Sequence, residues 1–229
     1  MPHIVSLALQ EWVVSMLGSV HTLNLHYCKN ITNVSMLGLV HTLSLSNCKN
    51  ISNISMLSSV HTLNLSYCKN ISDVSNLGSV HTLNLSDCKN IKDVNMLGSV
   101  YTLYLSYCNI SDVSNLGSVH TLYLIGCKNI LDVSKLGSVH NLNLGDCENI
   151  SNVSMLGSLH TLNLSYCKNI KDIGNLRKLK KLKINKKVYG LHFLEELEKL
   201  EITKECELKM KGEIKKLKRL NKKVEIKFM

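Results

Sequence analysis

The chain has few of the residues that break regular structure or join separate domains. Its 229 residues include one proline, Pro2, and only twelve glycines, so no stretch has the composition of a flexible linker. No apolar run approaches the roughly 20 residues that a membrane-spanning helix needs. At the N-terminus, Ile4 to Leu9 is apolar, but no lysine or arginine precedes it and Gln10 follows, which is unlike a secretory signal. We therefore expect a soluble protein that is not secreted.

The sequence also lacks the patterns that carry catalysis. It contains no glycine-rich phosphate loop, no nucleophile that occurs only once beside a base, and no pair of cysteines at C-x₂-C spacing. We therefore expect no enzymatic activity, no cofactor and no metal site.

What the sequence does contain is one pattern that recurs about every twenty residues from Val20 to Gly174. A representative unit is Val60-His-Thr-Leu-Asn-Leu-Ser-Tyr-Cys-Lys-Asn-Ile-Ser-Asp-Val-Ser-Asn-Leu-Gly-Ser79. Its apolar skeleton is V-x-x-L-x-L-x-x-C-x-x-I-x-x-V-x-x-L. A repeat of this length predicts a stacked solenoid in which each unit buries its apolar face against its neighbours.

Each repeat predicts one short strand. The leucines alternate with polar residues as in a strand with one buried face, and the pairs are Leu23/Leu25, Leu43/Leu45, Leu63/Leu65, Leu83/Leu85, Leu103/Leu105, Leu122/Leu124, Leu142/Leu144 and Leu162/Leu164. Successive strands should pair in parallel, about 4.8 Å apart. A unit of this length leaves little room after Cys28, so we expect 3₁₀ or irregular turns near Leu37, with no long helix.

Both ends of the repeat array depart from the pattern. We interpret residues 1–19 as a degenerate N-terminal repeat or cap that includes Trp12. Residues 20–174 form eight near-identical repeats, and residues 175–229 form divergent C-terminal repeats or a cap. The strand pattern persists at Leu182 and Leu200 and again near Ile226, so the whole chain predicts about twelve strands in one continuous domain.

The skeleton, with cysteine in its usual asparagine-or-cysteine position, resembles leucine-rich repeat proteins over nearly the whole chain. The near-identical unit is similar to short repeats of uncharacterised proteins from large DNA viruses and protists. The resemblance implies an α/β solenoid that is mostly β: a right-handed ribbon with a parallel sheet on its concave face and 3₁₀ or irregular turns on its convex face. Such proteins usually bind other proteins on the concave face. We therefore expect a monomeric, non-catalytic scaffold for an unidentified protein partner.

Three polar positions recur in the repeat. The cysteines (Cys28, Cys48, Cys68, Cys88, Cys108, Cys127, Cys147 and Cys167) are interpreted as small buried side chains whose weak S–H donors meet loop carbonyls, with disulfides or metal binding as alternatives. This interpretation favours a reducing, intracellular compartment, the cytoplasm. Histidines such as His41 should lie where each strand begins, and their protonation should lower stability below about pH 6. Asp73 alternates with asparagine in other repeats, which favours turn capping over acid catalysis.

The candidate binding residues lie where the repeat changes. Tyr104 and Tyr123 replace the asparagine between the two leucines, Ile125 replaces the following serine, and Tyr101 replaces a histidine. Tyrosine is a common interface anchor, so these residues are the predicted protein-binding site. The alternative is drift among duplicated repeats, since tyrosine also favours strands.

The net charge of +10 predicts a second candidate surface. Residues 1–170 hold eight basic and eight acidic side chains, whereas residues 171–229 hold nineteen basic and nine acidic ones. The basic clusters include Lys180, Lys181, Lys183, Lys218, Arg219, Lys222 and Lys223. They give an alternative function, binding of nucleic acid or an anionic membrane. The two phenylalanines offer little for base stacking, and the interleaved glutamates favour a solvated cap instead.

Overall fold

The computed structural model describes residues 17–229, and the predicted N-terminal repeat with Trp12 lies almost entirely outside them. Contacts between Cα atoms divide the chain into two compact units, residues 1–110 (unit 1) and residues 111–229 (unit 2). The two units are described separately below.

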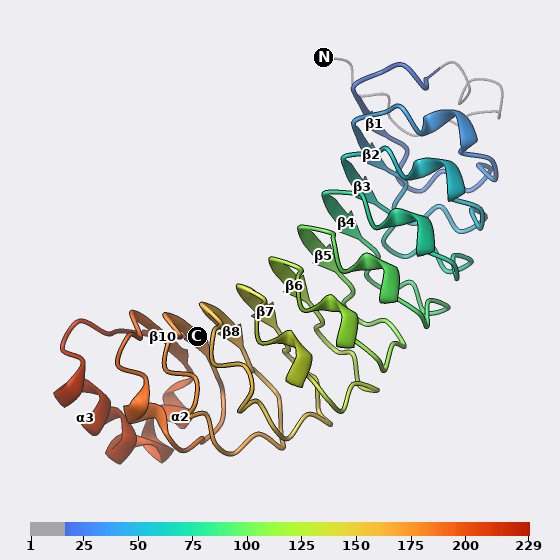
Figure 1. Ribbon diagram of the computed structural model, residues 1–229. Helices are drawn as coiled ribbons and strands as arrows, with labels where there is room; N and C mark the ends of the chain where they lie inside the picture. The colour runs from blue at the N-terminus through green and yellow to red at the C-terminus, as the bar shows by residue number, and fades with distance from the viewer. Residues whose placement is uncertain (1–16) are drawn as a thin grey trace. The chain divides into compact units, whose positions relative to one another are not determined.

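Unit 1 is built from coils that each contribute one three-residue strand to a parallel sheet (Figure 1). The strands are β1 (Thr22–Asn24), β2 (Thr42–Ser44), β3 (Thr62–Asn64), β4 (Thr82–Asn84) and β5 (Thr102–Tyr104). Each pairs with the next in register, so that Leu23 lies opposite Leu43 and Leu43 opposite Leu63. On the opposite side of each coil lies a 3₁₀ turn: η1 (Ser35–Leu37), η2 (Ser55–Leu57), η3 (Ser75–Leu77) and η4 (Asn95–Leu97).

Unit 2 continues the same pattern and then changes it. The strands β6 (Thr121–Tyr123), β7 (Asn141–Asn143), β8 (Thr161–Asn163), β9 (Lys181–Lys183), β10 (Lys199–Ile202) and β11 (Glu225–Phe228) pair in parallel in that order. The 3₁₀ turns are η5 (Ser114–Leu116), η6 (Ser134–Leu136) and η7 (Leu191–Phe193). Between η6 and η7 the described chain makes irregular turns on that side of the coil.

The core consists of the predicted skeleton positions. In the second coil, Leu43, Leu45 and Cys48 are at most 1% exposed. The later positions Ile51 and Leu57 are likewise fully buried. A single coil cannot bury these side chains alone, because removing apolar surface from water requires the coil on either side. The repeated skeleton therefore explains why the strands stack in register.

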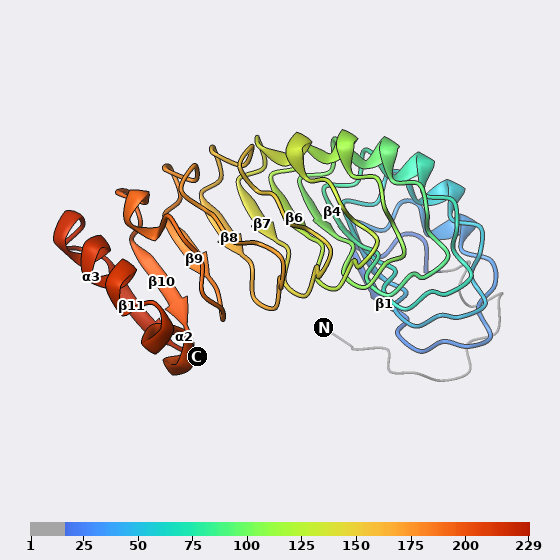
Figure 2. The ribbon, with the colours of Figure 1, turned by 90° about the horizontal axis from the view of Figure 1, so that it is seen from below.

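The C-terminal part of unit 2 contains two helices that the sequence pattern does not predict. They are α2 (Lys204–Lys209) and α3 (Lys211–Leu220), and they connect β10 to β11 (Figure 2). The hydroxyl of Thr203 accepts the backbone N–H of Cys206 at 3.2 Å and caps the start of α2. Ile214 and Leu217 of α3 are buried, as expected for two residues three apart on one helical face. These helices replace the short turn of the regular repeat in the last coil.

The fold class predicted from the sequence is confirmed. All eleven strands expected from Val20 onward are present and parallel, and the chain is an α/β leucine-rich repeat solenoid that is mostly β. Among residues 17–229, no helix combines the length and apolar character needed to cross a bilayer.

Candidate functional site

Two residues of the predicted tyrosine site belong to unit 1 and two belong to unit 2. In unit 1, the exposed ring of Tyr101 stacks on His81, with ring centroids 4.9 Å apart and planes at 16°. Tyr104 ends β5 in register with Asn84 and is half-buried. In unit 2, Tyr123 ends β6 in register with Asn143 and is also half-buried.

Ile125 follows β6 and is half-buried as well. Tyr104 and Tyr123 occupy the outward position at the ends of their strands, as the sequence predicts, whereas Tyr101 lies in the histidine row before β5. Because Tyr101 and Tyr104 belong to unit 1 and the other two residues to unit 2, a single continuous patch stays a prediction.

The basic residues of the alternative site have two different environments. Lys180 pairs with Glu198 at 3.1 Å, and Lys183 lies 3.9 Å from Glu201, so the cluster around β9 is partly neutralised by the next strand. Lys181 of the same strand is exposed. A second set forms no ion pair within the described residues and is exposed: Lys218, Arg219, Lys222 and Lys223. This second set, on α3 and just after it, leaves its charge free for an anionic ligand.

The cysteines form a hydrogen-bonded row in each unit. In unit 1, the thiols of Cys48, Cys68 and Cys88 each donate to the carbonyl of the second leucine of the preceding coil, with Sγ–O distances of 3.1 Å. In unit 2, the thiols of Cys147 and Cys167 make the same bond at 3.0 Å. These bonds confirm the interpretation of the cysteines as buried S–H donors.

Burial also keeps these thiols protonated. Loss of solvation raises the pKa of Cys48 to about 12 and that of Cys68 to about 11. Because the thiolate is the reactive form, neither side chain is suited to act as a nucleophile near neutral pH. Among residues 17–229, no group of three or more histidine, cysteine, aspartate or glutamate side chains could hold a metal ion.

The histidines form a stack in each unit. In unit 1, the ring of His41 lies between His21 and His61, with centroid distances of 4.5 and 4.7 Å. In unit 2, His140 lies between His120 and His160 at 4.8 and 4.5 Å. Partial loss of solvation, followed by repulsion from the neighbouring rings, lowers the pKa of His41 and of His140.

The predicted turn-capping role of the acidic position is confirmed. The carboxylate of Asp73 accepts the backbone N–H of Ser75 at 2.9 Å, and the side chain of Asn33 does the same for Ser35 at 3.0 Å. The bond from Ser75 lowers the pKa of Asp73. Both residue types provide the same acceptor at the start of the 3₁₀ turn, which explains why they interchange.

Sequence reasoning missed a surface at the other end of each strand. The residue after Leu25-His26 has a left-handed backbone in every described coil of unit 1. The positions are Tyr27, Asn47, Tyr67, Asp87 and Tyr107, with φ of 60–62°. Two residues later comes an exposed lysine in the first four coils: Lys29, Lys49, Lys69 and Lys89. We call this set of lysines, with Tyr27 and Tyr67, the lysine edge.

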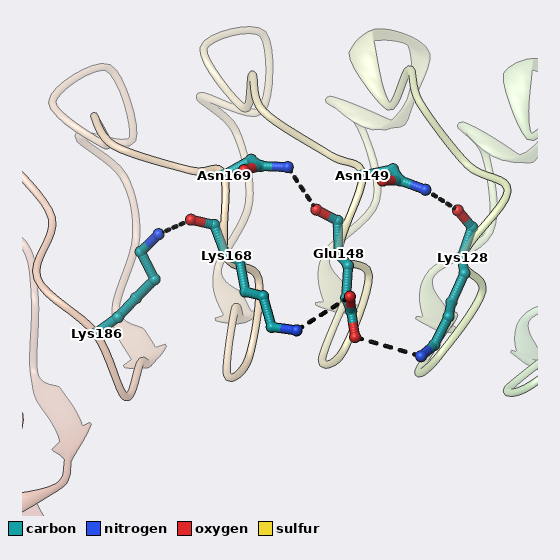
Figure 3. A network of polar contacts seen from close by, with 6 residues as sticks. All are labelled: Lys128, Glu148, Asn149, Lys168, Asn169 and Lys186. Carbon is teal, nitrogen blue, oxygen red and sulfur yellow. Dashed lines mark hydrogen bonds and ion pairs between the residues drawn. The ribbon is translucent and has the colours of Figure 1, made fainter.

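The corresponding row in unit 2 is interrupted by an acidic residue. Glu148 replaces lysine and bridges Lys128 at 3.3 Å and Lys168 at 3.1 Å (Figure 3). Hydrogen bonds from these ammonium groups lower the pKa of Glu148, and the bond to Glu148 raises the pKa of Lys128. The signal in the sequence was the lysine that follows six of the eight repeat cysteines, with Asn109 after Cys108 and Glu148 after Cys147 as the exceptions.

Asparagine side chains hold the backbone of this row together. In unit 2, the amide of Asn149 donates to the carbonyl of Lys128 at 2.7 Å, and that of Asn169 donates to the carbonyl of Glu148 at 2.8 Å (Figure 3). The ammonium of Lys186, which lies one coil further along the chain, donates to the carbonyl of Lys168. The loop backbones are therefore fixed, while the side chains of Lys128 and Lys168 stay mostly exposed.

Comparison with known proteins identifies similar solved structures only. A scan against protein-family models and a search of curated protein sequences found no match. The internalin InlF from Listeria monocytogenes is 27% identical, with a TM-score of 0.60, covering 87% of this chain and 66% of that one. The functional domain of InlJ from the same organism, described as including a cysteine ladder, is 20% identical, with a TM-score of 0.63, covering 83% and 45%.

A third similar structure is internalin C2 from L. monocytogenes, which is 22% identical, with a TM-score of 0.60, covering 77% of this chain and 84% of that one. The chain therefore spans less than two thirds of the length of InlF and of the InlJ domain. The expected similarity to viral and protist proteins stays a prediction. The chain has the leucine-rich repeat solenoid fold that these internalins share.

Proposed function

We propose that the chain is a non-catalytic interaction module that binds a protein partner on the outward face of its sheet. The observation that carries this proposal is the layout of the strands. In β2 to β8 the central leucine is buried while the residues on either side are half-buried and point outward. Each unit thus presents a fixed grid of side chains.

Within this grid, Tyr104 and Tyr123 are the proposed anchors, one in each unit. In the described strands they are the aromatic residues at a position that asparagine usually fills. Tyrosine supplies a large apolar ring with a polar tip, and truncating such an anchor commonly weakens binding by about 2 kcal/mol. The leucine-rich repeat fold supports protein binding in general, but a fold does not identify the partner. Which protein binds depends on the side chains of the site.

The test is capture of partners from a lysate, followed by quantification of each captured protein by mass spectrometry. We expect at least one protein that the unmodified chain retains and that Tyr104→Ala or Tyr123→Ala loses by about thirtyfold, equivalent to the ~2 kcal/mol above. Asn84→Ala and Asn143→Ala, at the facing positions of the neighbouring strands, are the matched controls. Equal capture by both tyrosine variants and the controls would remove these residues from the proposal.

Two further properties belong to this proposal. All nine cysteines are free thiols and buried, which suits a reducing intracellular compartment. We also take the chain to act as a monomer, and light scattering in solution tests that directly.

A second candidate function is binding of a polyanion at the C-terminal end of unit 2. The supporting observation is that Lys218, Arg219, Lys222 and Lys223 are exposed and form no ion pair among the described residues. Retention on heparin that disappears with modest salt, and that Arg219→Ala weakens, would support this function. Retention that is unchanged in Arg219→Ala would argue against it.

A further inference from the structure

The lysine edge of unit 1 has a regular backbone geometry. Because β1 to β4 pair in register, successive lysines are one strand spacing apart, about 4.8 Å along the row. The amide of Asn50 donates to the carbonyl of Lys29 at 2.7 Å, and the amide of Asn90 donates to the carbonyl of Lys69 at 2.8 Å. The loops that carry the lysines are therefore held in place before any ligand arrives.

The charge of this row is not balanced within the unit. In the described part of the chain, Lys29, Lys49 and Lys69 form no ion pair, and Lys89 lies 3.5 Å from Asp87. Like charges on neighbouring strands repel one another, so the row opposes stacking of the coils. In unit 2 the same position is neutralised by Glu148 between two lysines (Figure 3). The repeat can therefore pair its lysines with a glutamate, as it does in unit 2, but Lys29, Lys49 and Lys69 of unit 1 lack such a partner among the described residues.

The tyrosines of the edge add a second unusual feature. Tyr27 and Tyr67 lie two residues before Lys29 and Lys69 and are 52% and 50% exposed. Their φ of 62° is uncommon for a bulky side chain, because the Cβ atom then crowds the backbone. Strain of this kind persists where surrounding structure imposes it and is concentrated at functional surfaces. The strained positions carry their phenol groups two residues before lysines of the row, and the phenol of Tyr67 interacts with Asp87 of the next coil.

We infer that the lysine edge binds an acidic, extended segment of a protein partner. This inference rests on the proposed protein-binding function and specifies the chemistry of the partner. Charge complementarity carries it: four lysines cover three strand spacings, about 14 Å, which is the length of about four residues of extended peptide. Carboxylates along such a segment pair with the ammonium groups and accept hydrogen bonds from the phenols.

The spacing of the tyrosines fits an extended polypeptide. Tyr27 and Tyr67 lie two coils apart, about 10 Å, because Asn47 occupies the coil between them. Side chains of an extended peptide project to one face about every 7 Å and reach both the lysines and the phenols.

The test uses a fluorescein-labelled peptide of about ten glutamates and measures its affinity by fluorescence anisotropy at low salt. Lys49→Glu places a glutamate between Lys29 and Lys69, as in the Lys128–Glu148–Lys168 arrangement. The variant should therefore fold normally while losing most of the positive charge of the row. We expect this variant to lose at least about tenfold in affinity, equivalent to ~1.4 kcal/mol. The matched control, Lys135→Glu, makes the same change in net charge in unit 2, at an exposed lysine of η6 outside both proposed sites, and should lose less than about twofold.

A gain of function provides the complementary test. Glu148→Lys extends a lysine row through unit 2 and should raise the affinity for the glutamate peptide. If Lys49→Glu fails to fold, which circular dichroism would show, Lys49→Gln removes one charge without reversing it and should still weaken binding about threefold. Unchanged affinity in the folded Lys49 variant, or an equal loss in Lys135→Glu, would overturn the assignment.

Two outcomes separate this inference from the proposed function. If a single-stranded oligonucleotide of about ten thymidines binds as tightly as the peptide, and loses affinity equally in Lys49→Glu, the edge is a nucleic-acid site instead. If a partner captured through Tyr104 or Tyr123 binds Lys49→Glu normally, protein binding on the sheet face stands and the acidic-segment assignment fails.

Discussion

In the described part of unit 1 the lysines that follow the buried cysteines form a row in which only Lys89 has an acidic partner, whereas in unit 2 a glutamate stands between two of them. The core positions are the same in both units: Leu45 and Leu144 are each fully buried, as are Cys48 and Cys147. The core is therefore fixed by stacking, while the edge after each strand is free to differ. That freedom makes the edge, and not the core, the part of the repeat where recognition can be encoded.

The turn side of the coils also differs between the 3₁₀ turns and the irregular turns of unit 2. In unit 1 the 3₁₀ turns η1 and η2 approach closely at a glycine: a Cβ atom on Gly38 would lie 2.2 Å from the carbonyl oxygen of Met56. In unit 2, near the irregular turns, a Cβ atom on Gly157 would lie 3.3 Å from the carbonyl oxygen of Asn175. Neighbouring turns pack more tightly where the 3₁₀ geometry is regular.

The largest expected effect tests this difference in packing. Gly38→Ala should destabilise the protein by about 2 kcal/mol, because backbone must move to accommodate the new methyl group. Gly157→Ala should change the free energy of unfolding by less than about 0.5 kcal/mol, since only a small adjustment is needed. Urea unfolding measures both. Equal effects would show that the 3₁₀ turns and the irregular turns do not differ in packing in the way that the distances indicate.

The regular repeat was predictable because each of its features is set by local pattern. The alternation at Leu63 and Leu65 gave the strand, and the short connection to Leu77 predicted the 3₁₀ turn η3. The asparagine-aspartate exchange at Asp73 predicted a turn cap, which the bond to Ser75 confirms. Each conclusion used residues within one twenty-residue unit, and stacking repeats the result along the chain.

The features that were missed depend on interactions between coils or on positions where residue type is uninformative. Tyrosine at Tyr67 gives no sign of a left-handed backbone, because the loop geometry imposes it against the preference of the residue. The pairing of Lys180 with Glu198 depends on the register of β9 and β10. The helix α3 lies in a segment whose abundant lysines obscure the apolar positions Ile214 and Leu217.

The second prediction concerns acid and applies to both units. The pKa of His41 and of His140 is lowered in the folded chain, so the unfolded chain binds protons first as the pH falls. Stability should therefore be fully present above the ordinary histidine pKa of about 6.5 and decline below it. We expect the melting temperature to fall by several degrees between about pH 8 and about pH 5.5, the range that spans this pKa.

Tyrosine already replaces histidine in the stack at Tyr101, so substitutions of this kind should be tolerated. His41→Tyr in unit 1 and His140→Tyr in unit 2 should each reduce the acid sensitivity. Thermal melting followed by circular dichroism at both pH values is the measurement. A melting temperature that is independent of pH in the unmodified chain would show that the stacked rings do not govern acid stability.

The third prediction compares one backbone position in both units. Tyr107 has φ of 60°, and Gly126 has φ of 68° at the same place in the next coil along the chain. Tyr107→Asn should stabilise the protein by about 0.5 kcal/mol, because asparagine tolerates this conformation and already occupies it at Asn47. Gly126→Tyr should destabilise it by about 1 kcal/mol. Changes of the opposite sign in denaturant unfolding would rule out backbone strain as the dominant effect.

The smallest expected effect comes from the glutamate that distinguishes the two rows. Glu148→Gln leaves Lys128 and Lys168 without their partner and so reproduces, in unit 2, the unneutralised charge of unit 1. The pKa of Glu148 is lowered, so its contribution to stability is present above the ordinary glutamate pKa of about 4.3 and is lost as the pH falls through the lower folded value.

At neutral pH and low salt, Glu148→Gln should lower the melting temperature slightly, and added salt should remove the difference, because exposed ion pairs are screened. Glu196→Gln is the matched control, since Glu196 is exposed and forms no ion pair in the described chain. If the two variants melt alike at low salt, repulsion along a lysine row is too weak to oppose stacking. The unpaired row of unit 1 would then need no ligand to explain it, and only the binding measurements on Lys49→Glu could keep the lysine edge as a site.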